Sequence, residues 1–429
     1  MDRTYVPVSA KCLPAILASV VLIAGIAFAG SAFAGSKYSV VYPFPNEKHG
    51  YRPYELIADA AGNLYGGTQY GGDSCCGVVF QLTPPGKAGG KWTETVLYSF
   101  SEGRFGAGIG SLVFDGSGNL YGVASAAGKS GFGFVFKLTP PHQPGAHWTE
   151  TTIYDFSGWD GYQPGGLTVD PAGNLYGATF GGGIECRGFG CGTVYQLTPP
   201  THGGRWKRAV LYFFKGVTGG NGSGDGANPF YVIFDKKGNL FGATYGGGQC
   251  QQAACYGTIF ELKAPAKKGG DWKERVLYRF SSNLGLVSGV VFDKSGALYG
   301  ATLNSVYQLA QKGGVWSYTD LQDFNGGSGG YYLLAGVIPD EAGNVYGTTA
   351  GGGSGDGIVF RLAPPDNGGA WTETVLHDFA TGHDGNEPAG NLVFGKGGFL
   401  YGTTLMGGVE NKCGIYASPG CGTVFRIAP

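Results

Sequence analysis

One unit recurs seven times along this chain, and the recurrence constrains the fold more than any other feature. A core of the form GNLYG lies at residues 62–66, 118–122, 173–177, 238–242, 296–300, 343–347 and 398–402. Around each core lie four runs rich in β-branched and aromatic residues, while Gly and Pro are confined to the connections. The pattern predicts four strands per unit and no helical region after the N-terminal segment.

The length of the unit favours one all-β architecture. Four strands repeated about every 50 residues are typical of propeller blades, whereas a solenoid coil needs only about 20 to 30 residues. The last unit stops at Pro429 after its third run, and residues 37–44 resemble the missing fourth run. We therefore predict a single seven-bladed β-propeller over residues 35–429, closed by the N-terminal strand, which completes the last blade.

The composition excludes several other classes of protein. The chain has 84 Gly among 429 residues, without the period of three that collagen requires. Charged and aromatic residues each make up 14%, which argues against disorder. The formal net charge of −1 gives no excess of positive charge that would favour binding to nucleic acid or to an anionic membrane.

The first 34 residues are predicted to be a signal peptide. Arg3 and Lys11 precede an apolar run that starts at Leu13, and residues 32–34 have the A-x-A form of a cleavage site. An uncleaved membrane anchor is the alternative, because the run approaches spanning length. We expect cleavage near Ala34 and a secreted or periplasmic protein.

An Asp-x-x-Gly turn precedes the core in six of the seven units. Asp at its first position accepts hydrogen bonds from the turn amides, and Gly at its fourth tolerates a positive φ. We interpret these aspartates as turn formers: Asp59, Asp115, Asp170, Asp235, Asp293 and Asp340.

The complete unit resembles a known family. Its consensus, D-x-x-G-N-L-Y-G-T-T followed by G-T-V-F-x-L-T-P-P and W-T-E-T-V-L-Y-x-F, is similar to the GloVer (Gloeo/Verruco) tandem repeat of exported bacterial proteins. The resemblance covers nearly all of residues 37–429. It implies an exported bacterial propeller-like protein and transfers no catalytic residue. Members carry C-terminal surface anchors, and this chain departs from them by ending at Pro429.

The cysteines after the signal segment fall between the second and third strands of four units. They are Cys75 and Cys76, Cys186 and Cys191, Cys250 and Cys255, and Cys413 and Cys421. We favour pairing within each loop, and the Cys75/Cys76 pair is uncertain because a bridge between neighbours is strained. Bridges between blades are the alternative, since the last unit becomes a neighbour of the first. A zinc site is disfavoured because paired histidines are missing, and we predict no metal and no cofactor.

The same loop face carries the candidate binding residues. A D-G-x-x-P connection starts at Asp160, Asp225 and Asp384 and could either be a turn that every blade needs or supply groups for a hydroxyl-rich ligand or a cation. Residues that break the repeat on this face are further candidates: Trp159, Tyr162, Arg104, Phe105, Arg187, Phe189, Tyr51 and Arg52. The fifth unit lacks the Gly-rich loop, which could leave a notch there.

The sequence favours binding over catalysis. The six histidines are scattered, and neither a G-x-S-x-G elbow nor a carboxylate pair outside the repeat is present. We expect a monomeric, non-catalytic binding module for a glycan or a protein partner. A structural cell-surface protein and a carbohydrate-active hydrolase or lyase are the alternatives.

Overall fold

The computed structural model describes residues 38–429 apart from short internal segments. The residues outside the description are 1–37, 75, 88, 102–106, 144–146, 184–185, 187–189, 218–223, 249, 252–253, 268, 282–288, 367, 381–382, 410–412 and 414–419. The predicted signal peptide therefore lies outside the described residues.

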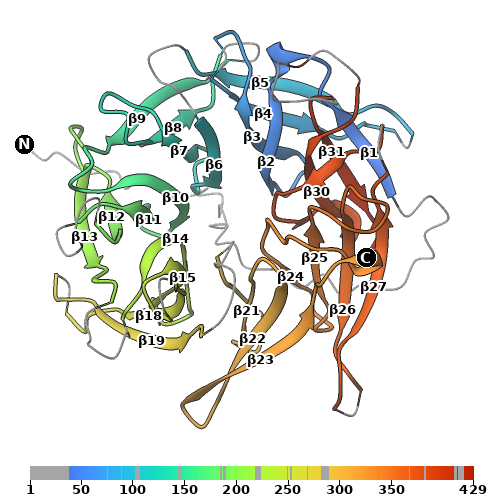
Figure 1. Ribbon diagram of the computed structural model, residues 1–429. Coiled ribbons are helices and arrows are strands. Elements are labelled where there is room, and N and C mark those ends of the chain that lie inside the picture. Colours follow the sequence, from blue (N-terminus) through green and yellow to red (C-terminus); the bar gives the residue numbers. More distant parts are fainter. Residues whose placement is uncertain are drawn as a thin grey trace, which may run out of the picture.

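The chain forms a ring of seven antiparallel sheets, as the repeat predicts (Figure 1). Blade 1 has β2 (Tyr51–Ala58), β3 (Leu64–Tyr70), β4 (Val78–Thr83) and β5 (Thr93–Ser99); blade 2 has β6 (Ala107–Phe114), β7 (Leu120–Ala126), β8 (Phe134–Thr139) and β9 (Thr149–Asp155). Blade 3 has β10 (Tyr162–Val169), β11 (Leu175–Gly181), β12 (Thr193–Thr198) and β13 (Lys207–Phe213); blade 4 has β14 (Ala227–Phe234), β15 (Leu240–Gly246), β18 (Thr258–Lys263) and β19 (Lys273–Arg279).

Blades 5 to 7 follow the same order. Blade 5 has β20 (Val291–Phe292), β21 (Leu298–Ala301), β22 (Ser305–Lys312) and β23 (Val315–Asp323); blade 6 has β24 (Ile338–Pro339), β25 (Val345–Thr349), β26 (Ile358–Ala363) and β27 (Thr372–Asp378). Blade 7 has β28 (Asn386–Pro388), β29 (Val393–Phe394), β30 (Leu400–Met406), β31 (Thr423–Ile427) and β1 (Tyr38–Pro43). A small hairpin, β16 (Cys250–Gln251) and β17 (Ala254–Cys255), projects from blade 4. The first strands lie nearest the centre of the ring and the fourth strands lie at its rim (Figure 1).

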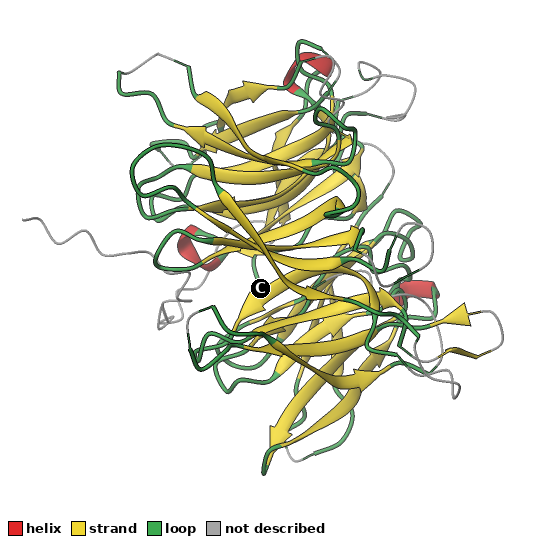
Figure 2. Cartoon of the chain, turned by 90° about the vertical axis from the view of Figure 1, so that its left-hand side faces the viewer, coloured by secondary structure: helices red, strands yellow, loops and turns green. Residues whose placement is uncertain are grey.

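Helical structure is almost absent from the described chain (Figure 2). It is limited to the short 3-10 turns η1 (Glu47–His49), η2 (Gly327–Gly329) and η3 (Lys396–Gly398). None of the described helical turns has the length and hydrophobicity of a membrane span.

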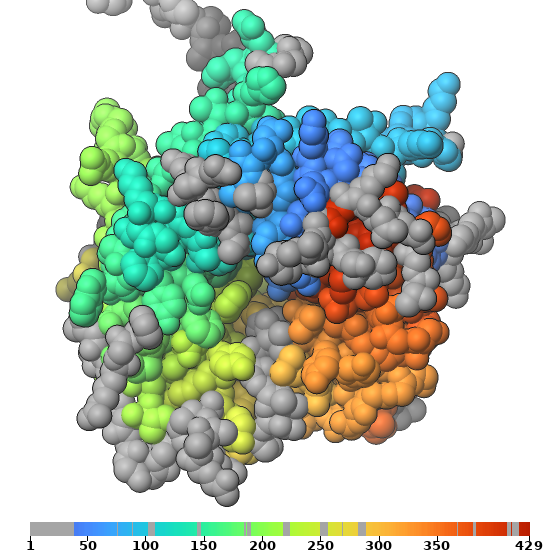
Figure 3. Space-filling view, turned by 45° about the horizontal axis from the view of Figure 1, so that its top comes forward, coloured from blue at the N-terminus to red at the C-terminus, as the bar shows by residue number. Residues whose placement is uncertain are grey.

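The ring closes as the sequence predicts. Strand β1 pairs antiparallel with β31, with Tyr38 opposite Ile427 and Pro43 opposite Thr423. The first and last blades lie side by side on the surface, blue against red in Figure 3. Closure removes the two free sheet edges that an open array would expose.

The core lies between the blades, and aromatic side chains join each blade to the next. At every junction an aromatic ring at the end of one blade's fourth strand packs on an aromatic ring of the next blade's third strand. The pairs are Phe44/Phe80, Phe100/Phe136, Phe156/Tyr195, Phe214/Phe260, Phe280/Tyr307, Phe324/Phe360 and Phe379/Phe425, with centroids 4.6 to 5.5 Å apart. The repeated Phe therefore joins each blade to the next.

The repeated turn is built around its Asp, which confirms that interpretation. In blade 2, Asp115 Oδ1 accepts hydrogen bonds from the amides of Ser117 and Asn119, and its Oδ2 accepts from Asn119 Nδ2 at 2.6 Å and from the Tyr121 hydroxyl at 3.2 Å. Gly118 has φ +81°, a conformation that favours Gly. The Asp, Asn and Tyr of the motif therefore recur because one carboxylate joins them.

Candidate functional site

Asp160 organises the D-G-x-x-P connection of blade 3. Its Oδ1 accepts hydrogen bonds from the Ser157 amide at 2.7 Å and the Ser157 hydroxyl at 2.8 Å, and its Oδ2 accepts from the Tyr154 hydroxyl. Arg208 Nη1 donates to the Asp160 carbonyl oxygen. Burial alone raises the pKa of Asp160, but the hydrogen bonds from Tyr154 and Ser157 and the nearby Arg208 outweigh burial and lower it. The carboxylate is thus ionised and occupied by its own turn.

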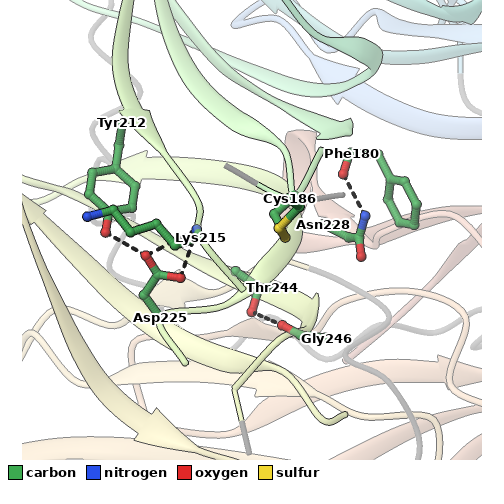
Figure 4. The surroundings of a disulfide bond; sticks show 9 residues. Phe180, Cys186, Tyr212, Lys215, Asp225, Asn228, Thr244 and Gly246 are labelled. Atoms are coloured by element: carbon green, nitrogen blue, oxygen red, sulfur yellow. Dashed lines mark hydrogen bonds between the residues drawn. A yellow bond between two sulfur atoms is a disulfide. The ribbon is translucent and has the colours of Figure 1, made fainter. Parts of the chain in front are cut away.

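Asp225 and Asp384 hold the same position in blades 4 and 7. Asp225 accepts from the Tyr212 hydroxyl at 2.7 Å and from the Lys215 amide at 3.0 Å (Figure 4), and burial raises its pKa. Asp384 accepts from the Ala380 amide at 3.1 Å, and His377 Nε2 lies 3.3 Å from its Oδ2. Each carboxylate lies beside a Tyr or His side chain of a fourth strand. Because the fourth strands form the rim of the propeller, these carboxylates lie toward the rim. Their role in ligand binding stays a prediction.

The residue before the Pro in this connection has a strained backbone. Gln163, Asn228 and Glu387 have φ between +50° and +61°, although none is Gly. The amide of each donates to a carbonyl oxygen of the preceding blade, those of Phe132, Cys191 and Asp356 respectively, at 2.8 to 3.2 Å. These bonds between blades explain why the strain is tolerated. They also fix the side chains of these residues on the loop face.

The remaining candidate binding residues differ in exposure, and several of them lie outside the described residues. Trp159 lies in the turn from Gly158 to Gly161 and is 79% exposed, while its carbonyl oxygen accepts from the Gly183 amide at 3.1 Å. Tyr162 is partly buried and packs on Gly181, where an added Cβ would lie 2.0 Å from its ring. The predicted residues Arg104, Phe105, Arg187 and Phe189 lie outside the described residues.

The disulfides form within loops, as the sequence favours. Cys186 bonds to Cys191, and Cys413 bonds to Cys421, each with a Cα–Cα distance of 5.4 Å. Cys250 and Cys255 are partners in the β16–β17 hairpin, and their side chains lie outside the described part of the chain. Cys76 is buried and its thiol donates to the Ser74 carbonyl oxygen at 2.8 Å, while Cys75 is not among the described residues.

The blade 3 disulfide supports the connection to blade 4. A Cβ on Gly216 would lie 2.7 Å from Cys191 Sγ, so this connection runs directly against the bridge. We expect the variant with both Cys186→Ser and Cys191→Ser to lose about 2 kcal/mol of unfolding free energy, from the chain-entropy cost of a six-residue loop. Chemical denaturation under non-reducing conditions measures this loss. Equal stability of the double variant and the parent would contradict a supporting role for the bridge.

Blade 5 has a tight turn where the other blades have Gly-rich loops. The Thr302 amide donates to the Ser305 carbonyl oxygen at 2.8 Å, which joins β21 to β22 directly. Because residues 282–288 lie outside the description, the predicted notch remains a prediction. Among the described residues, no three His, Cys, Asp or Glu side chains converge as a metal site would require.

A polar layer crosses the centre of the ring, and sequence reasoning missed it. Each first strand of blades 1 to 4 has a register shift, which leaves two successive residues outside the ladder. At the second of these positions, Glu55 of blade 1 accepts from the Tyr231 hydroxyl of blade 4 and, at 3.0 Å, from Asn391 Nδ2 of blade 7. Asn391 Oδ1 accepts from the Gly336 amide at 2.6 Å. The Glu55 carboxylate thus links three blades, and Asn391 extends the network to a fourth.

Burial gives this carboxylate an unusual titration. It raises the pKa of Glu55 to about 7, against the opposing effect of the Tyr231 hydrogen bond. Burial and the adjacent Glu55 raise the pKa of Tyr231. Gly166 and Gly289 make room for the ring, because a Cβ on either would lie within 2.7 Å of Tyr231 atoms. A comparison of the seven units at this register would have shown Glu55, Tyr231 and Asn391 as departures from small residues.

The comparison with protein families finds a similar repeat over the first part of the chain. The model of the Gloeobacter/Verrucomicrobia repeat matches residues 24–189. Residues 24–189 are thus similar to the Gloeobacter/Verrucomicrobia repeat. The resemblance drawn from the sequence is therefore confirmed, and the blades beyond residue 189 carry the same turn and strand motifs of this repeat.

Solved structures show the same fold at low identity. The extracellular domain of the hybrid two-component system BT4673 from B. thetaiotaomicron matches with a TM-score of 0.52 and 12% identity, over 91% of this chain and 39% of that one. A second structure, titled as the extracellular domain of the one-component system BT4673, gives 0.50 and 12%, over 90% of this chain and 40% of that one. This chain thus spans about two fifths of the length of those chains. No curated protein matches it significantly.

Proposed function

We propose that this chain is an exported, non-catalytic binding module whose disulfide-bearing loop face engages a glycan or a protein partner. The observation that carries the proposal is a set of exposed aromatic side chains on that face. They are Trp159 (79% exposed), Tyr245 (53%), Tyr332 (51%), Phe230 (43%) and Tyr331 (39%). Apolar groups gathered on an exposed surface mark interaction sites more often than they serve stability.

Two further features support this assignment. The disulfides Cys186–Cys191 and Cys413–Cys421 stiffen loops of the same face, and a preorganised surface loses less entropy on binding. Disulfides persist in oxidising compartments, which agrees with the signal-like N-terminal segment and with an extracytoplasmic location. The similar structures are themselves titled as extracellular domains, a setting that would suit this chain.

The melting temperature of the full chain, produced with its disulfides, tests the proposal. A glycan at about 100 times its dissociation constant adds about 2.7 kcal/mol of stability, which a thermal shift detects. We expect a shift with a class of glycan or with a surface protein of the producing cell. We also expect Trp159→Ala to weaken that binding, and Val315→Ala to leave it unchanged.

Val315 is a suitable control because it is 69% exposed and lies at the β22–β23 hairpin, on the opposite face of the ring. Equal weakening by both substitutions would show that the loop face is not the binding surface. A complete absence of shift with every glycan and every surface protein would favour the structural role instead.

A further inference from the structure

The seven units provide an internal comparison of what each position of the blade requires. At the position after the second-strand Thr, the units carry Gln69, Ser125, Phe180, Tyr245, Leu303, Ala350 and Leu405. Blades 3 and 4 alone have an aromatic residue there, so the fold does not demand one. At the position after the buried Pro229, blade 4 has Phe230 and blade 1 has Tyr54, whereas blades 2, 3 and 7 have Gly110, Gly165 and Ala389.

These three departures meet at the border of blades 3 and 4. The Phe180 and Phe230 rings have centroids 6.2 Å apart at 81°, and the Phe180 and Tyr245 centroids are 6.3 Å apart at 50°. Phe230 and Tyr245 are 43% and 53% exposed, and Phe180 is partly exposed. The rings therefore form one exposed aromatic surface without being required by the blade.

The surface is held rigidly by bonds between the two blades. Asn228 Nδ2 donates to the Phe180 carbonyl oxygen at 2.7 Å, and the Asn228 amide donates to the Cys191 carbonyl oxygen at 2.8 Å (Figure 4). Cys191 is bonded to Cys186, so the disulfide anchors the same junction. In the view of Figure 4, Asn228 and Phe180 lie on one side of Cys186, and Asp225 lies on the other.

The chemistry of the surface is aromatic and neutral. The segments that build it, residues 178–181, 227–231 and 243–248, contain no charged side chain. Thr179 and Thr244 are buried and the Tyr231 hydroxyl donates to Glu55, so the polar groups left beside the three rings are the Asn228 amide and the Tyr245 hydroxyl. A sugar ring fits such a surface, because its C–H face packs on an aromatic ring while its hydroxyls bond to neutral amides and phenols. A charged ligand would find no counter-charge in these segments.

We propose that Phe180, Phe230 and Tyr245 form a binding platform for a neutral glycan, with Asn228 as its hydrogen-bonding residue. The proposal rests on the proposed function and names the place and the ligand class. The rings supply stacking surface, and the bonds between blades 3 and 4 preset their spacing. Neutral polysaccharide chains are the occupant.

The repeat itself supplies substitutions that the fold tolerates. Phe180→Ser, Phe230→Ala and Tyr245→Ala introduce residues that other blades hold at the same positions, namely Ser125, Ala389 and Ala350. The control is Val315→Ala, which removes an exposed apolar side chain from the opposite face of the ring. Tyr245→Ala alone is the mildest variant, since the ring it removes is more than half exposed.

Isothermal titration of the full oxidised chain with cellohexaose, xylohexaose, mannohexaose, chitohexaose and hexagalacturonate tests the proposal. We expect binding of at least one neutral hexaose, a loss of at least about tenfold in affinity for each platform variant, and no change for Val315→Ala. Unchanged melting temperatures show that the variants are folded.

The outcomes separate the platform from the proposed function. Binding of a neutral hexaose with equal affinity by the parent and Tyr245→Ala would overturn the platform while leaving the binding module intact. Binding of hexagalacturonate alone would overturn the neutral class. If no oligosaccharide binds and the chain instead captures a surface protein, the platform is wrong and the proposed function stands.

Discussion

Phe44→Ala is expected to lower the unfolding free energy by about 3–5 kcal/mol, which is the range for removing a large aromatic side chain from a packed core. Phe44 has no exposed surface, and its ring packs on Phe80 of blade 1 at 5.1 Å and on Tyr42 at 5.2 Å. Its amide also donates to the Gly422 carbonyl oxygen at 3.1 Å. The substitution thus weakens the contact that joins blade 7 to blade 1. Chemical denaturation followed by near-UV circular dichroism measures the effect.

Phe100→Ala is the matched control, because Phe100 makes the equivalent contact with Phe136 between blades 1 and 2. A similar loss in both variants would show that the closing junction is energetically equivalent to a continuous one. A loss below about 1 kcal/mol for Phe44→Ala, the size of a typical surface substitution, would show that β1 is not required for a stable ring.

The second large effect is a loss of stability as the pH rises from about 4.5 to about 7. Burial raises the pKa of Glu55 from 4.5 to about 7, so in this interval the folded chain holds a proton that the unfolded chain has released. Stability from this group is full below the unfolded-state pKa and is lost as the pH approaches the folded-state pKa. The shift corresponds to at most about 3 kcal/mol.

Glu55→Gln tests this expectation directly. Glutamine does not titrate and keeps an oxygen that accepts from Asn391, so the variant should be more stable than the parent at pH 8 and equal to it near pH 4.5. Glu47→Gln is the control, because it removes the same charge from an exposed position. Burial and the nearby Asp225 also raise the pKa of Glu274 to about 7, and Glu274→Gln should remove a further part of the slope. A parent whose stability increases from pH 5 to pH 8 would contradict this account.

The repeated residues made the fold predictable. Three kinds of residue have the same structural role in all or nearly all of the seven units: the turn Asp, the Gly of each core and the fourth-strand Phe. A role that recurs in this way can be recognised from the sequence. The closing strand was predictable for the same reason, since residues 37–44 have the fourth-strand pattern but precede the first complete unit. The structure showed in addition that the repeated Phe contacts the next blade.

The residues outside the repeat were harder to interpret. The sequence left open whether Asp160, Asp225 and Asp384 are turn residues or ligand groups, and the structure shows that their oxygens accept hydrogen bonds from nearby backbone amides. Glu55 and Tyr231 are separated by 176 residues, and their contact depends on the diameter of the ring and on the side chains that fill it. Spacing in the sequence carries no information on such a distance.

The closing strand also imposes an order of events on the folding chain. Domains form from the N-terminus as synthesis proceeds, yet β1 can pair only when residues 423–427 are available. The first strand to be made is therefore the last to be placed, and the Ser39–Arg426 bond spans 387 residues. Until then β1 and the edge of β31 remain open to pairing with other chains. A cell that makes this protein has to keep its first strand apart from other copies until the last one is complete.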